Sequence, residues 1–314
     1  MISFLILIAG LALLLFAGDY LVRGAVSLAE KLGISPLVIG LTIVAFGTSA
    51  PELLVSLKAA FTGVYGIAIG NVVGSNIANV LLVLGAPALI APIACKEKGI
   101  GFSLFIMALL TVVLMTMMGS GILDHVDGLI LLLILIFFLS WQFIRARRDR
   151  VTAALGGDYH DELDELPAEN SRIAAYLLFG LIGLPVGASL TVNGAVDIAR
   201  VFGVSETIIG LTIVAIGTSL PELVTTVMAA WRGSGAVAIG NVVGSNIFNM
   251  AAILGITSLV HPLYVPSHIV HIDMWIMAIT SALLILWSLL GKSITRVHGV
   301  VMLALFVTYV VAVF

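Results

Sequence analysis

Charged residues are scarce in this sequence, and cysteine is almost absent. Lys, Arg, Asp and Glu make up 10% of the 314 residues, whereas soluble domains carry roughly 25%. This scarcity excludes an ordinary water-soluble domain. The single cysteine, Cys95, excludes an intramolecular disulfide. The sequence also lacks the alternation of polar and apolar residues that the strands of a transmembrane barrel require, so a barrel is excluded as well.

The sequence is instead rich in long apolar runs. Hydrophobic residues account for 61% of the chain, and runs of about 20 residues, the length that crosses a bilayer as a helix, recur from end to end. The sequence therefore predicts an all-α integral membrane protein with ten transmembrane helices. These are expected near residues 2–29, 36–61, 67–90, 101–119, 127–144, 173–199, 206–231, 237–259, 272–290 and 297–313.

The distribution of Lys and Arg predicts the orientation in the membrane. If both termini face outside and the ten helices alternate in direction, every basic residue except Lys58 and Arg200 lies at or near the inner face. The largest basic cluster, "RARRDR" at 145–150, then belongs to a cytoplasmic segment. We expect a multi-pass protein of the inner (plasma) membrane.

The chain contains an internal duplication. The hydrophilic linker 145–172 separates a first half, residues 1–144, from a second half, residues 173–314. A shift of 170 positions aligns the halves without a gap, with 31 identities in the 53 positions of Gly33–Gly85. Equivalent helices are five apart, an odd number, so the second copy is inverted relative to the first. Inverted five-helix repeats are typical of secondary transporters.

Two polar motifs repeat inside the apolar runs. The motif "GTSAPE" ends at Glu52 and "GTSLPE" ends at Glu222. The proline in each motif predicts a kinked or broken helix, because it removes a backbone donor and crowds the preceding turn. Irregular backbone at membrane depth is tolerated only where it is buried in protein or lines a cavity. Each carboxylate costs roughly 2.5–3.5 kcal/mol to insert, so we expect both to carry function.

The expected site is built of oxygen ligands. Each "GTS" is followed by "GNVVGSN", which adds serine and asparagine one helix later. Carboxylates, hydroxyls, amides and carbonyls suit hard cations such as Ca2+ or Na+, and the lack of thiolate and imidazole disfavours Zn2+ or Cu+. From the residues alone, one Ca2+, two or three Na+ ions, or protons could balance the two glutamates.

These doubled motifs resemble the two repeats of the calcium/cation antiporter superfamily, and most of all the prokaryotic sodium/calcium exchangers. The resemblance implies a calcium site made by Glu52, Glu222, Thr48 and Thr218. It implies sodium sites that add Ser49, Ser219, Ser75, Ser245 and the backbone carbonyls of Ala45 and Ala215, with Asn79 and Asn249 lining the centre. Some relatives carry aspartate at the position of Asn249, so this site holds at most two formal negative charges.

The expected function is exchange of Na+ for Ca2+ by alternating access, in which the first and sixth helices slide past a static core. A Ca2+/H+ antiporter using the same glutamates is the alternative. A cation channel is less favoured, because one chain supplies a closed two-fold site. An intramembrane hydrolase at Ser49 or Ser219 lacks a nearby base, so we expect no enzyme. We expect no cofactor and no nucleic-acid partner, and a chain that functions as a monomer.

Overall fold

A computed structural model describes residues 2–95, 97–155, 169–203 and 215–313. Within these residues, seven helices are long and apolar enough to cross a membrane, and a bent pair makes an eighth candidate. The helix at Arg296–Ala312 is apolar but shorter. The predicted seventh span, 206–231, lies partly outside the described residues. The expectation of a helical membrane protein is therefore met.

The first half supplies one long helix, a broken helix, a central helix and two further spans. Its elements are α1 (Ile2–Leu32), α2 (Pro36–Ile39), the π-helix η1 (Gly40–Val44), α3 (Ala45–Thr48), α4 (Ala50–Phe61), α5 (Tyr65–Ala78), the π-helix η2 (Asn79–Val83), α6 (Gly85–Ala88), β1 (Ile93–Ala94), α7 (Ile100–Met118), β2 (Ile122–Leu123) and α8 (His125–Leu155).

The second half repeats this order. Its elements are α9 (Asn170–Val201), α11 (Ala215–Thr218), α12 (Leu220–Trp231), α13 (Gly235–Phe248), the π-helix η4 (Asn249–Ile253), α14 (Leu254–Val260), β3 (Leu263–Tyr264), the π-helix η5 (Ile269–Asp273), α15 (Met274–Leu289), β4 (Ser293–Ile294) and α16 (Arg296–Val313). The bounds of α3, α4, α5 and η2 recur 170 positions later as those of α11, α12, α13 and η4. The sequence repeat is therefore also a repeat of local structure.

The predicted break in the second span is confirmed. The axis of Pro36–Thr48 and the axis of Ala50–Phe61 differ by 42°. Ser49 occupies the break with φ −84° and ψ 3°, and Pro51 stands in the first turn of α4, where its missing N–H costs no helical hydrogen bond. Ser219 has nearly the same backbone angles, φ −87° and ψ 5°, between α11 and α12.

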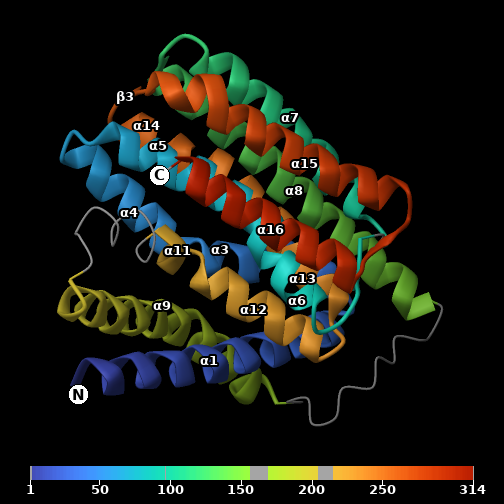
Figure 1. The fold of residues 1–314 in the computed structure, drawn as a ribbon. Helices are drawn as coiled ribbons and strands as arrows, with labels where there is room; N and C mark the ends of the chain where they lie inside the picture. Colours follow the sequence, from blue (N-terminus) through green and yellow to red (C-terminus); the bar gives the residue numbers. More distant parts are fainter. Residues whose placement is uncertain (1, 96, 156–168, 204–214, 314) are drawn as a thin grey trace.

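The helices α1 and α9 run antiparallel in close contact along one side of the molecule (Figure 1). Small residues permit the approach: a Cβ added to Gly10 would lie 2.6 Å from Thr191 Oγ1, and one added to Gly24 would lie 3.1 Å from the Leu177 nitrogen. Residues later in α1 therefore contact residues earlier in α9, as expected for antiparallel helices. These two helices, which are equivalent in the repeat, point in opposite directions.

The centre of the protein is formed by α5 and α13. Residues 237–255 are all buried, and the span from Tyr65 to Ala88 is mostly buried. Two short antiparallel ladders join the halves: β1 pairs with β4, and β2 pairs with β3. Because β1 precedes α7 and β2 follows it, the ladders lie at the two ends of that helix. Broad apolar surfaces elsewhere are exposed, as contact with lipid requires.

One boundary differs from the prediction. The fifth span was expected to end at 144, but α8 continues to Leu155. The added residues, "RARRDRVTAAL", include several good helix formers, so the basic cluster begins on a helix and not in a loop. The remainder of the predicted linker lies outside the described residues up to 168.

Candidate cation-binding site

Each repeat places its glutamate in the first turn of a helix that follows the break. Glu52 lies in the first turn of α4, and Glu222 lies in the first turn of α12. The unpaired backbone N–H groups at a helix start favour a negative charge there. Ser49 and Ser219 stand at the N-cap positions, but neither hydroxyl caps its own helix. Both hydroxyls are therefore available to other partners.

The two carboxylates are fully buried and close enough to repel each other. The Ser49 hydroxyl donates to Glu222 Oε1 over 3.2 Å. Within the described part of the chain, Glu222 Oε2 and both carboxylate oxygens of Glu52 have no hydrogen-bond partner, and neither glutamate forms an ion pair. Buried carboxylates without a donor or a counter-charge are costly, so this centre suits a cation.

The hydroxyl groups around the carboxylates come from both halves. The Thr48 hydroxyl lies 3.2 Å from Asn241 Oδ1 and 3.4 Å from the Ser245 hydroxyl, which brings α3 against α13. Thr48 is fully buried and also interacts with the Glu222 carboxylate. Ser75, the counterpart of Ser245 on α5, is buried as well. The contacts join the first repeat's "GTS" to the second repeat's "GNVVGSN".

Two asparagines tie the glutamate helices to the central helices. Asn71 donates its side-chain amide to the Glu52 carbonyl over 3.2 Å and to Ser56 Oγ over 3.1 Å. Asn241 makes the equivalent bonds to the Glu222 carbonyl, 3.3 Å, and to Thr226 Oγ1, 3.0 Å. These contacts join α4 to α5 and α12 to α13. Ser56 and Thr226 were not predicted. Their common spacing, four residues after each glutamate, was the available signal.

The central asparagines begin the π-helices. Asn79 is the first residue of η2, and Asn249 is the first residue of η4. Asn79 donates to Asn246 Oδ1 over 3.1 Å. Among the described residues, Asn79 Oδ1 and both polar atoms of the Asn249 amide have no partner. Wide helical turns of this kind are often found at functional sites, and these amide oxygens are further potential ligands.

The remaining expected ligands have different surroundings. The Ala45 carbonyl already accepts the Ser49 N–H over 3.1 Å and the Thr48 hydroxyl over 3.3 Å. Ser219 Oγ has no partner in the described chain, and Thr218 is half-buried. Ala215 begins α11, and its side chain lies outside the described residues. Direct contacts therefore connect half of the expected ligands, namely Ala45, Thr48, Ser49, Glu52, Glu222 and Ser245.

The chemistry of the centre is that of neutral oxygens around two carboxylates. Among the described residues, no three or more His, Cys, Asp or Glu side chains are placed so that they could hold a metal ion together. A soft-metal site would require thiolates or imidazoles. A hard cation needs only oxygen atoms, and neutral hydroxyl, amide and carbonyl oxygens can complete its coordination.

The comparisons with known proteins agree with this chemistry. The sequence profile described as sodium/calcium exchanger protein matches residues 2–144 and 172–314. The chain is 35% identical to the sodium/calcium exchanger MaX1 of Methanosarcina acetivorans, over 100% of this chain and 99% of that protein. It is 38% identical to the inner membrane protein YrbG of Escherichia coli, over 82% of this chain and 79% of that one.

A solved structure provides the corresponding likeness in three dimensions. The sodium-calcium exchanger NCX_Mj, soaked with 2.5 mM Na+ and 0.1 mM Ca2+, superposes with a TM-score of 0.84 and 33% identity. The match covers 100% of this chain and 99% of that chain. With both halves matched by the family profile and the whole chain matched by an exchanger structure, this protein belongs to the sodium/calcium exchanger family.

Proposed function

We propose that this membrane antiporter exchanges Na+ for Ca2+ at the paired glutamates. The observation that carries the proposal is that Glu52 and Glu222 are fully buried and form no ion pair in the described chain, while three of their four oxygens lack a partner. Mobile cations are the natural counter-charges. MaX1 is named a sodium/calcium exchanger, and NCX_Mj was soaked with Na+ and Ca2+, which supports the same pair of ions.

The residues divide into two ligand sets in this proposal. Ca2+ is held by Glu52, Glu222, Thr48 and Thr218. Na+ ions use Ser49, Ser219, Ser75, Ser245 and the carbonyls of Ala45 and Ala215, with Asn79 and Asn249 at the centre. Ca2+ and the full complement of Na+ share the carboxylates, so they occupy the site in turn. The ions are the transported substrates, and no further cofactor is needed.

The proposed topology has ten helices in two inverted halves, 1–144 and 173–314, joined by a cytoplasmic linker at 145–172. Both termini face outside across the inner membrane. The antiparallel direction of α1 and α9 supports the inversion, because these helices are equivalent in the repeat. Alternating access by movement of this pair past the central helices, in a monomer, completes the proposal.

The test is 45Ca2+ uptake into liposomes that contain the purified protein. An outward Na+ gradient should drive uptake, and Glu52→Gln or Glu222→Gln should abolish it. Glu169→Gln is the matched control, because Glu169 is exposed beside Arg172 and is not among the expected ligands. Full uptake in either site variant would overturn the proposal.

Proton coupling is the alternative function, since a buried carboxylate can also be neutralised by a proton. The same liposomes distinguish the two when Na+ and pH gradients are imposed separately. Uptake that follows the Na+ gradient at constant pH supports Na+/Ca2+ exchange. Uptake that ignores Na+ and follows an imposed pH gradient supports Ca2+/H+ exchange.

A further inference from the structure

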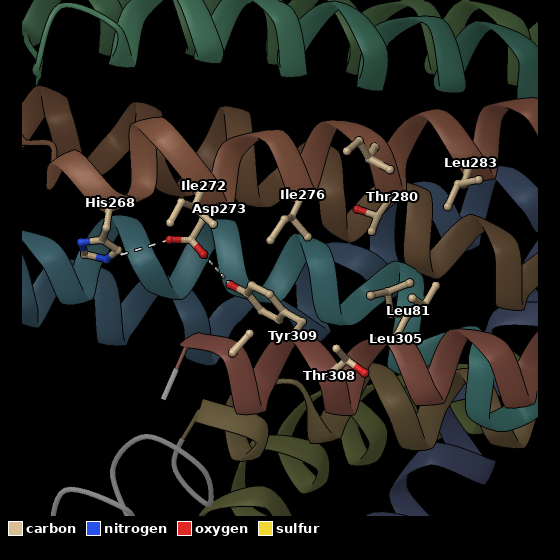
Figure 2. A pocket seen from close by; sticks show the side chains of 12 residues that line it. Leu81, His268, Ile272, Asp273, Ile276, Thr280, Leu283, Leu305, Thr308 and Tyr309 are labelled. Carbon is tan, nitrogen blue, oxygen red and sulfur yellow. Dashed lines mark hydrogen bonds and ion pairs between the residues drawn. The ribbon is translucent and has the colours of Figure 1, made fainter.

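A cavity of about 480 Å³ lies between α15 and α16, away from the paired glutamates. Its walls are aliphatic along most of their length, and Leu81 of η2 lies among its lining residues (Figure 2). Ile279 and Leu305 beside it are 59% and 46% exposed, as residues that face lipid are. The cavity is therefore a groove that opens toward the membrane.

A carboxylate closes one end of this groove. The Asp273 side chain is 8% exposed, and its Oδ1 accepts a hydrogen bond from the Tyr309 hydroxyl over 3.1 Å. Its Oδ2 lies 3.9 Å from Nε2 of His268, whose side chain is 63% exposed. Figure 2 shows the carboxylate between these two side chains. Oδ1 of Asp273 thus accepts a direct hydrogen bond, whereas the nearest ion-pair partner of Oδ2 is 3.9 Å away, so Oδ2 can accept a hydrogen bond from a further donor.

The other hydroxyl groups of the groove are already used. Thr280 donates to the Met277 carbonyl over 2.9 Å, and Thr308 donates to the Ala304 carbonyl over 2.9 Å. Each bond lies within its own helix, so these side chains present mainly methyl groups. The groove is therefore apolar along its length and polar at one end.

The equivalent positions of the first repeat are built differently. Thr308 and Ala312 correspond, by the shift of 170, to Phe138 and Gln142. Phe138 is fully buried, and Gln142 is buried and donates to Ser103, the counterpart of Asp273. Large side chains and an internal hydrogen bond occupy this place in the first half. The second half has small side chains and a carboxylate, so the groove is not a by-product of the shared fold.

The length of the groove fits a hydrocarbon chain. From Asp273 to Leu283 the groove follows ten residues of helix, about 15 Å at 1.5 Å per residue, which is half the hydrocarbon thickness of about 30 Å.

We propose that this groove binds an aminophospholipid, with one acyl chain between α15 and α16 and its ammonium group at Asp273 Oδ2. A primary ammonium offers three N–H donors, and hydrogen bonds between charged groups are the strong ones. The lipid phosphate then lies at the exposed imidazole of His268. Choline carries no N–H, so the ethanolamine headgroup is distinguished from phosphatidylcholine by the same carboxylate.

The experiment uses the full chain, purified in detergent and stripped of lipid. Thermal unfolding is followed while phosphatidylethanolamine, phosphatidylcholine or phosphatidylglycerol of identical acyl chains is added. We expect half-maximal stabilisation at about tenfold lower phosphatidylethanolamine than phosphatidylcholine, which corresponds to about 1.4 kcal/mol. The proposal would be overturned if phosphatidylethanolamine and phosphatidylcholine gave half-maximal stabilisation at equal concentrations, or if phosphatidylglycerol acted at the lowest concentration.

Two variants test whether the stabilisation by lipid depends on the groove. Asp273→Asn should reduce the preference for ethanolamine to the level of choline, and Thr308→Phe, which copies the first repeat, should abolish stabilisation by both lipids. Asp197→Asn is the matched control, because Asp197 is half-exposed beside Arg200. A preference that persists in Asp273→Asn would overturn the proposal.

A photoactivatable phosphatidylethanolamine provides a readout that does not depend on stability. Cross-links should map to α15 and α16 in the unaltered protein, and to a lesser extent in Thr308→Phe. Cross-links that map only to other helices would also overturn the proposal. Oligomeric state measured by light scattering tests the competing occupant: a dimer that Thr308→Phe dissociates would assign the groove to a second copy instead.

Discussion

The Asp19 carboxylate of α1 pairs with the guanidinium of Arg232, which directly follows α12. Arg23, one turn further along α1, lies 3.9 Å from the same carboxylate and stacks against the ring of Tyr176 on α9. The positions equivalent to Asp19 and Arg232 in the other half are Ser189 and Thr62, which carry no charge. The repeat is therefore asymmetric in charge at this contact between α1 and α12.

Replacing Asp19 by serine, the residue of the other half, should lower the thermal stability of the protein. The two side chains are 16% and 30% exposed, so we expect a loss of about 1–3 kcal/mol, above that of an open surface pair. Differential scanning fluorimetry in detergent measures the change. Asp197→Ser breaks the half-exposed pair with Arg200 and should cost less than about 0.5 kcal/mol. Equal losses in the two variants would contradict this account.

Ser49→Ala should destabilise the ion-free protein more than Ser219→Ala. Ser49 donates to the buried Glu222 carboxylate, whereas Ser219 Oγ has no partner in the described chain. Loss of a hydrogen bond to a charged group costs about 1.5–3 kcal/mol. Saturating Ca2+ should reduce the difference, because a bound cation balances the carboxylate directly. Melting temperatures with and without Ca2+ provide the measurement, and equal effects of the two variants would count against the asymmetry.

Gly244→Ala should prevent close packing of α13 on η1 and α3. An added Cβ would lie 2.6 Å from the Ala45 Cβ and 2.7 Å from the Leu41 carbonyl oxygen. Backbone on one side cannot yield easily, so we expect a loss of about 1–3 kcal/mol or more. Folded yield by size-exclusion chromatography and the melting temperature measure it. Gly101→Ala, which meets no described atom within 4 Å, is the control and should behave like the parent protein.

The thiol of Cys95 should resist maleimide in the folded protein. Cys95 is fully buried after β1, and burial raises the pKa of its thiol to about 11 from 9.0. The reactive thiolate is therefore rare at neutral pH. Between about pH 9 and 11 the unfolded thiol ionises while the folded thiol does not, so stability falls across that window. Since the chain has one cysteine, labelling reports unfolding without background, and rapid labelling of native protein would refute the prediction.

The break before Glu52 could be predicted from sequence because it has a local cause. Pro51 removes one backbone donor wherever the helix lies, and the structure bends the chain by 42° there. The convergence of the two halves was also predictable, because nearly identical motifs in related repeats occupy equivalent places. Side-chain type and spacing were sufficient for both inferences.

The differences between the halves were not predictable in the same way. Ser49 and Ser219 occupy equivalent positions in two motifs that differ at one residue, yet only Ser49 donates to a glutamate in the described chain. The π-helices at Asn79 and Asn249 depend on packing around α5 and α13, which no propensity scale contains. The groove at Asp273 depends on the side-chain volumes of both α15 and α16. The apolar sequence of one helix does not reveal whether the side chains that face it from the other helix are large or small.

The glycine-lined contact between α1 and α9 has a mechanical consequence. Gly10 meets Thr191 at one end and Gly24 meets Leu177 at the other, with backbone atoms inside the range where a methyl group would clash. This long contact resists sliding of α1 along α9, because sliding would push side chains of one helix against glycine positions of the other, where there is no room for a Cβ. In the proposed alternating access, α1 and α9 are therefore expected to move together as one rigid body, so that one displacement with one energy barrier would open the site to one side of the membrane and close it to the other.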